Sequence, residues 1–209
     1  MRNSLIIVLI FFSTLTFALD IENYFSTMPN ALLPVLTQRQ RIELLEYYKA
    51  EKGDSIENYF GKQSRMLFLD VQTQHLKIQT TQSSTFEMFI LSSDTLSLPA
   101  IGIIRTVCAP ICHSSVTFYD SSWHVIPMPV DMPKAIEWID ENALSKNENT
   151  TTFLQPFLAV SFISLQFDAE TTSLAASNNN LDFLTAEERK QVQPFIRQET
   201  IHKSIANIR

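Results

Sequence analysis

The sequence predicts an α+β fold: an antiparallel β-meander with N-terminal helices and a C-terminal helix and strand extension packed on one face. Three observations support this prediction. Helix-capping patterns begin at Thr37 and again at Thr185. Between them lies a run of short stretches in which apolar residues alternate with a period of two. The polar breaks between these stretches are too short for the crossovers that parallel strands need, so neighbouring strands are expected to pair antiparallel.

The residues before the sheet are predicted to be helical. Asp20 is placed to cap a short helix over Ile21–Phe25, and the same five letters recur at Ile56–Phe60, which predicts a second short helical turn. Thr37 and Gln40 form a capping box that opens an amphipathic helix. Such a helix needs an apolar surface to cover, and the predicted sheet supplies one.

The sheet is predicted to begin near Ser64 and to contain five or six strands. Its centre is the stretch 101–120, where two alternating runs of β-branched and aromatic residues flank a turn at Pro110. Proline presets φ and has no N–H to donate, so it belongs to the turn. A short strand over Trp123–Ile126 is expected to end the meander.

The C-terminal half is predicted to add helices and a few strands. A helix is expected to begin at Asp131, with Ile136 on its apolar face. The other predicted elements are, in chain order, a polar loop at 145–152, a strand over 157–167 buried on both faces, its hairpin partner at 172–175, a short helix opened by the capping box Thr185–Glu188, and a last strand in the tail.

Both cysteines of the protein, Cys108 and Cys112, lie at the turn of the central hairpin. Opposite positions of paired strands are close enough for a disulfide, so we expect this bond to form in an oxidising compartment. Closing so short a loop is worth about 2 kcal/mol in the chain-entropy model. Cys108, Cys112 and His113 also allow a redox dithiol or a metal site, and C-x3-C-H is one residue longer than the haem-attachment motif.

The first 18 residues have the features of a secretory signal peptide. Arg2 precedes the apolar run Leu5–Phe12, and small residues at Thr16 and Ala18 predict cleavage between Ala18 and Leu19. The run is shorter than the roughly 20 apolar residues of a membrane span, so we expect a periplasmic or secreted protein rather than an integral membrane protein. Residues 19–209 are expected to form one α+β domain, and any sub-boundary would fall near 127–131.

Charge and motifs exclude several classes of function. Removing residues 1–18 takes away one base and no acid, which changes the net charge from −6 to −7, and a chain of this charge is repelled by nucleic acid. The three glycines, Gly53, Gly61 and Gly102, cannot form a dinucleotide-binding or P-loop motif. Without a catalytic motif nearby, the scattered His75, His124 and His202 are expected at surfaces or turns.

Several short motifs occur in an order that resembles a known family. They are Met28–Leu36, Ser84–Met88, Phe118–Asp120 with Trp123, and Leu184–Arg189 leading to Pro194 and Phe195. With the signal peptide, the chain is similar to a family of small exported proteins of unknown function known mainly from gut Bacteroidales (domain of unknown function 3256). This resemblance implies a Gram-negative envelope address, and it implies no reaction, ligand or catalytic residue.

The function expected from these observations is a non-enzymatic binding or structural module of the cell envelope. It would bind an unidentified protein or ligand through its sheet surface or loops, without a cofactor. The competing hypothesis is a redox or metal-handling protein built on Cys108, Cys112 and His113. A third, an inhibitor-like module, rests on fold analogy alone.

Overall fold

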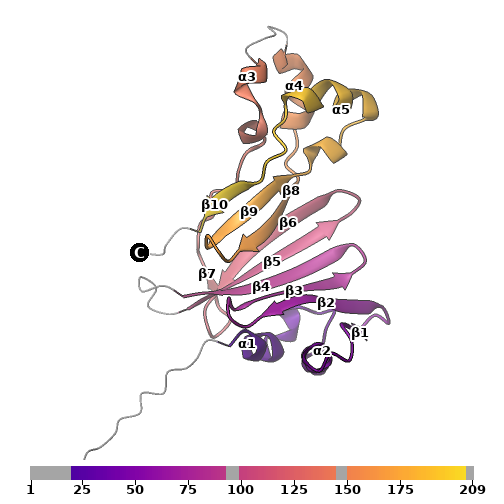
Figure 1. Cartoon of the computed structure of the whole chain (residues 1–209), viewed down its shortest axis with the longest axis vertical. Coiled ribbons are helices and arrows are strands. Elements are labelled where there is room, and N and C mark those ends of the chain that lie inside the picture. Colours follow the sequence, from indigo (N-terminus) through magenta and orange to yellow (C-terminus); the bar gives the residue numbers. More distant parts are fainter. Residues whose placement is uncertain (1–19, 93–98, 145–149, 206–209) are drawn as a thin grey trace, which may run out of the picture.

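The structure is a computed structural model that describes residues 20–92, 99–144 and 150–205. Figure 1 shows an elongated molecule with a large antiparallel sheet, two helices at one end and a lobe of helices at the other. The predicted α+β class and antiparallel meander are confirmed.

The large sheet has seven strands that pair in sequence order. Each pair is antiparallel, and the central hairpin joins β5 and β6 in the register that sets Cys108 opposite Cys112. The strands are β1 Ser55–Glu57, β2 Gln63–Asp70, β3 His75–Thr81, β4 Ser84–Leu91, β5 Ala100–Cys108, β6 Cys112–Tyr119 and β7 Val125–Ile126. The sheet therefore has one or two strands more than expected, because β1 forms where a helical turn was predicted.

The prediction of a helical turn at Ile56–Phe60 is wrong. Ile56 belongs to β1 and is 5% exposed, while Asn58 to Gly61 form the turn that leads into β2. Ile56 packs in the core between α2 and the sheet. The same five residues are helical at Ile21–Phe25. At 56–60 the burial of the Ile56 side chain favours the strand instead.

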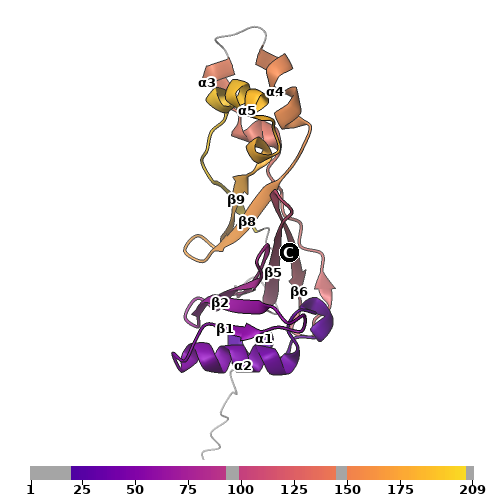
Figure 2. The ribbon, with the colours of Figure 1, turned by 90° about the vertical axis from the view of Figure 1, so that its right-hand side faces the viewer.

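Helices α1 Ile21–Thr27 and α2 Gln38–Lys49 cover one face of the large sheet (Figure 2). The predicted caps are confirmed: the Asp20 carboxylate accepts the N–H groups of Glu22 and Asn23 in α1, and Thr37 forms a capping box with Gln40. Arg41 is fully buried beneath the end of α1. Its guanidinium donates to the carbonyls of Phe25, Met28 and Leu36, which satisfies buried backbone groups.

The C-terminal extension packs on the opposite face of the large sheet. It contains a three-stranded antiparallel sheet in the order β10–β9–β8 and three short α-helices. Its elements are the 3-10 helix η2 Ala135–Trp138, α3 Glu141–Leu144, α4 Thr150–Leu158, β8 Ile163–Asp168, β9 Ser173–Asn178, η3 Asn180–Asp182, α5 Ala186–Val192, η4 Gln193–Phe195 and β10 Ile201–Ser204.

Several details of this half differ from the sequence prediction. The stretch 157–167 is the end of α4 followed by β8, and Thr150 to Thr152 begin α4; residues 145–149 of the predicted loop lie outside the described residues. The prediction of a helix that begins at Asp131 is wrong, because residues 131–134 are not helical and η2 begins at Ala135. Ile136 is 55% exposed, whereas Trp138 is 1% exposed and belongs to the core. The predicted capping box at Thr185, the hairpin partner and the last strand are confirmed.

Two hydrophobic clusters share the large sheet because successive residues of a strand point to opposite faces. Met88 and Ile103 belong to the cluster under α1 and α2, while Phe89 and Ile104 belong to the cluster under the C-terminal extension. Within the described parts of the chain, no helix is both long and apolar enough to cross a bilayer.

Candidate functional site

The turn that carries both cysteines lies at the tip of the β5–β6 hairpin. The Sγ atoms of Cys108 and Cys112 are 1.94 Å apart, which is disulfide distance. His113 follows on β6, where its Nδ1 accepts a hydrogen bond from the backbone N–H of Ile163 at 3.3 Å. This bond points the imidazole towards the C-terminal extension.

The metal hypothesis for this turn is not supported. Among the residues described by the structure, no group of three or more His, Cys, Asp or Glu side chains is placed to hold a metal ion. Cys108 and Cys112 are paired with each other, and the Nδ1 atom of His113 is already an acceptor. The three residues that the sequence grouped together are therefore engaged in structural contacts.

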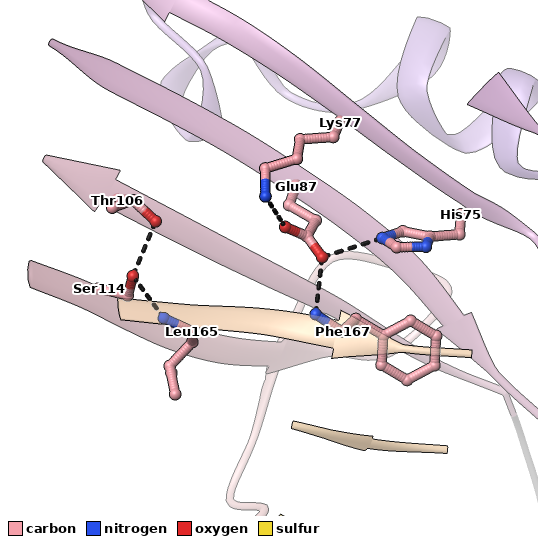
Figure 3. A network of polar contacts seen from close by, with 7 residues as sticks. All are labelled: His75, Lys77, Glu87, Thr106, Ser114, Leu165 and Phe167. Atoms are coloured by element: carbon pink, nitrogen blue, oxygen red, sulfur yellow. Dashed lines mark hydrogen bonds and ion pairs between the residues drawn. The ribbon is translucent and has the colours of Figure 1, made fainter. Parts of the chain in front are cut away.

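A polar network joins the two sheets on the face that the extension covers (Figure 3). Its centre is Glu87 on β4, which is 1% exposed. One carboxylate oxygen lies 2.9 Å from Nε2 of His75 and accepts the backbone N–H of Phe167 at 2.7 Å, and the other lies 2.9 Å from Nζ of Lys77. A charge buried so deeply requires partners of this kind, and it has three.

The backbone N–H groups at the free edge of β8 donate hydrogen bonds to side chains of the large sheet. Strand β9 pairs with one edge of β8, and the N–H groups of Ile163, Leu165 and Phe167 point away from it. His113 accepts the first, Ser114 Oγ accepts the second at 2.9 Å, and Glu87 accepts the third. An exposed strand edge is thereby covered without extending either sheet.

Burial alone would raise the pKa of the Glu87 carboxyl, and this is the largest single influence on it. The hydrogen bond from His75, the charge of Lys77 and the N–H of Phe167 together outweigh it, so the pKa lies below its usual range. Glu87 is therefore ionised at neutral pH, and the imidazole nitrogen that faces it carries a hydrogen.

The expectation that His75 lies at a surface or turn is wrong, because it is 6% exposed within β3.

A groove of about 500 Å³ opens beside His75, between the β2–β3 turn and the β8–β9 turn. Phe68 and Phe167 contact the two sides of the His75 ring edge to face, with centroids 4.6 and 5.2 Å from it. The carboxyl groups that line the groove are Asp70, Asp168 and Glu170, and none of its described lining residues is Lys or Arg. The groove thus combines aromatic side chains with three carboxyl groups.

The two aspartates of the groove are held in their ionised form by turns. A hydrogen bond from the Thr73 side chain and two backbone N–H groups lower the pKa of Asp70. The Thr171 side chain and the backbone of the β8–β9 turn lower the pKa of Asp168 in the same way. Glu170 is exposed, and its carboxylate has no ion-pair partner among the described residues.

Ser173, His202 and Asp168 meet at the rim of the groove without forming a hydrolase relay. Ser173 Oγ lies 3.1 Å and Asp168 Oδ2 lies 3.4 Å from the same nitrogen, Nδ1 of His202. A relay needs the acid and the nucleophile on opposite ring nitrogens, so this cluster does not activate Ser173 in that way. The ring of His124, at the β6–β7 turn, lies 3.3 Å from Asp120 Oδ2.

Sequence reasoning missed both Glu87 and the groove. The one available signal was a single carboxylate inside the apolar run Phe86–Leu91, because a charge there is either exposed or paired. Its partner on β8 is 80 residues away in the chain, and no local pattern could identify it.

The fold and the groove define an α+β sheet protein with an acidic groove between the β2–β3 turn and the β8–β9 turn. The chain belongs to the family of proteins of unknown function DUF3256, whose model matches residues 13–205. It is also similar in structure to a domain of an uncharacterized protein from Porphyromonas gingivalis W83, with 21% identity and a TM-score of 0.69 over 86% of this chain and 90% of that one. None of the curated proteins matches the sequence significantly. The family model confirms the predicted family of unknown function, and the solved structure supports the fold.

Proposed function

We propose that this chain is an exported binding module of the cell envelope and that its acidic groove holds an organic cation, an amine or a guanidinium. The observation that carries this proposal is the lining of the groove: Asp70, Asp168 and Glu170 around aromatic rings, with no Lys or Arg among the described lining residues. Low-dielectric walls strengthen the field of like charges, which attracts a counter-charge. The partly exposed ring of Phe68 adds affinity for the same kind of group.

The support for export comes from the sequence and from the cysteines. Residues 1–18 have the three regions of a signal peptide, and the two cysteines lie at disulfide distance. An intact mass of the protein recovered from the envelope after alkylation tests both points. We expect a chain that begins at Leu19 and carries no alkyl group. A chain with two alkylated thiols would instead favour the redox hypothesis for Cys108 and Cys112.

The cation hypothesis is tested by calorimetric titration with two probes, agmatine and a short peptide with one arginine. Together they distinguish a free small cation from a protein side chain as the source of the ligand. We expect binding of at least one probe, weaker binding at high salt, and no binding of free glutamate. Absence of binding by both cationic probes at millimolar concentration would contradict the proposal.

Glu170→Gln is the most informative variant, because it removes one charge from an exposed position without disturbing a described contact. A partly exposed charge pair is worth roughly 0.2–1 kcal/mol, so we expect the affinity to fall by up to about fivefold. The matched control is Glu141→Gln, an exposed acid on α3 that does not line the groove. If the control weakens binding equally, the attraction belongs to the net charge of the chain and not to the groove.

A further inference from the structure

Two large aromatic side chains stand exposed on the turn between β1 and β2. Tyr59 is 68% exposed and Phe60 is 64% exposed, and their rings meet edge to face with centroids 5.4 Å apart. Single exposed hydrophobic residues are normal on a protein surface, but adjacent exposed rings are the kind of anchor that interfaces use. We call residues 59–62 the aromatic tip.

The aromatic tip is held rigidly by a buried side chain. Asn58 is 3% exposed, and its Oδ1 accepts the N–H groups of Phe60 and Lys62 at 3.0 and 3.2 Å. Its amide nitrogen donates to Ser64 Oγ and to the Thr80 carbonyl, which ties the turn to β2 and β3. A preorganised tip loses little conformational freedom on binding, so its apolar area is available for affinity.

A hollow of about 650 Å³ lies between α1 and α2. These helices lie at the same end of the molecule as β1 and β2 (Figures 1 and 2). Its apolar lining comes mainly from Ile42 and Leu45 on α2, and Ile42 is 40% exposed. Glu22 at its rim is paired with Lys49 at 2.6 Å. The Glu46 carboxylate has no partner among the residues that the structure describes.

The charges of the tip and of the hollow are complementary. Lys62 completes the tip, and its ammonium group has no ion pair within the described chain. The Lys62 ammonium group could pair with the Glu46 carboxylate of the hollow. The rings of Tyr59 and Phe60 could pack on the apolar lining from Ile42 and Leu45. An anionic lipid surface would be a poorer partner for this end of the molecule, because the whole chain is acidic.

We infer that the α1–α2 hollow receives the aromatic tip of a second copy of this chain. Tip and hollow lie at the same end of each copy, so two copies related by a two-fold axis exchange tips reciprocally. The contact is then made twice, and the assembly closes as a dimer instead of growing into a filament. This inference is independent of the cation groove.

Sedimentation velocity across a range of protein concentrations tests the dimer. We expect the wild-type chain to dimerise, and we expect both Y59A/F60A and Ile42→Lys to weaken association at least tenfold. The first pair of changes removes the anchors, and the second places a cation where Lys62 would enter. Phe183→Ala is the control, because it removes an aromatic ring that is 53% exposed just before α5, and α5 lies at the opposite end of the molecule from α1 and α2.

Mixing the two variants adds a test that misfolding cannot imitate. Y59A/F60A keeps an intact hollow and Ile42→Lys keeps an intact tip, so the mixture should form one of the two contacts and associate more strongly than either variant alone. A wild-type chain that stays monomeric at millimolar concentration overturns the inference. So does a Phe183→Ala variant that dissociates as readily as Y59A/F60A, and so does a mixture no stronger than its parts.

Discussion

At the scale of single residues, a glycine and two phenylalanines determine how closely the sheets approach. Gly102 on β5 pairs with Phe89 on β4, and the Phe89 ring lies across it. That ring stacks on Phe167 of β8, with centroids 3.9 Å apart and planes 2° from parallel. A Cβ atom on residue 102 would lie 2.2 Å from the Phe89 ring, so any other side chain would displace the ring that joins the two sheets.

Gly102→Ala is therefore expected to destabilise the protein although alanine suits a strand better than glycine does. Overpacking a tight core costs about 1–3 kcal/mol, and we expect the free energy of unfolding to fall by that amount in urea titrations. Ser115→Ala, an exposed change on the neighbouring strand β6, should stay within about 0.5 kcal/mol of wild type. An unchanged unfolding midpoint for Gly102→Ala would show that Phe89 can move aside without cost.

Glu87 gives the second expectation at this scale, a dependence of stability on pH. Its pKa in the folded protein lies below its ordinary value of 4.5. The ionised carboxylate is thus favoured by folding, and its contribution is fully present above pH 4.5 and is lost as the pH falls through the lowered folded value. Glu87→Gln cannot titrate, so the stability difference between wild type and this variant should shrink as the pH falls.

Urea unfolding at a series of pH values from neutral to acidic measures this difference. We expect wild type to be more stable than Glu87→Gln at neutral pH, because the amide cannot balance Lys77 and places a hydrogen-bond donor against it. A difference that stays constant to acidic pH would mean that folding does not change the pKa of Glu87. Glu57→Gln, an exposed acid on β1, serves as the control.

At the scale of elements, one five-residue sequence adopts two structures. Ile-Glu-Asn-Tyr-Phe is helical at 21–25, where Asp20 caps it, and forms a strand and turn at 56–60. The capping boxes at Thr37 and Thr185 could be predicted because all of their contacts lie within one helical turn. The fate of Ile56 depends on its burial against other elements, which no local pattern contains.

The same distinction explains what could be foreseen of the candidate site. The cysteine pair was predictable, since Cys108 and Cys112 lie in one hairpin and their register follows from the turn. The acidic groove was not predictable. Asp70 ends β2 and Asp168 ends β8, and these strands are far apart in the chain. The two residues meet only when the extension packs on the sheet. Each looks alone like an ordinary turn residue.

Replacing both cysteines by serine tests the role of the hairpin turn. The bond closes a short loop, so its loss should lower the free energy of unfolding by about 2 kcal/mol and leave the fold intact. Urea unfolding of oxidised wild type, reduced wild type and the double variant measures the effect, and the last two should agree. Loss of the folded state in the double variant would mean that the disulfide stabilises the whole sheet and not only the β5–β6 turn.

At the scale of the whole molecule, the large sheet belongs to two hydrophobic clusters at once. Alternate residues of β4 and β5 face α1 and α2 or face the C-terminal extension. If α1 and α2 or the C-terminal extension detached, one apolar face of the same strands would be exposed to water. The connector at 127–131 leads from one cluster to the other, and Met128 already belongs to the second. The shared sheet argues that both clusters unfold together.

Each cluster contains one tryptophan that reports on it. Trp138 is buried in the second cluster, and Trp123 packs against the first. In Trp123→Phe the fluorescence follows Trp138, and in Trp138→Phe it follows Trp123. Within each variant, urea unfolding followed by fluorescence and by far-ultraviolet circular dichroism should give coincident transitions, as expected for a single cooperative unit. Fluorescence and circular dichroism transitions that differ within either variant would instead place a domain boundary at 127–131, and the large sheet would then have to remain folded with one apolar face exposed.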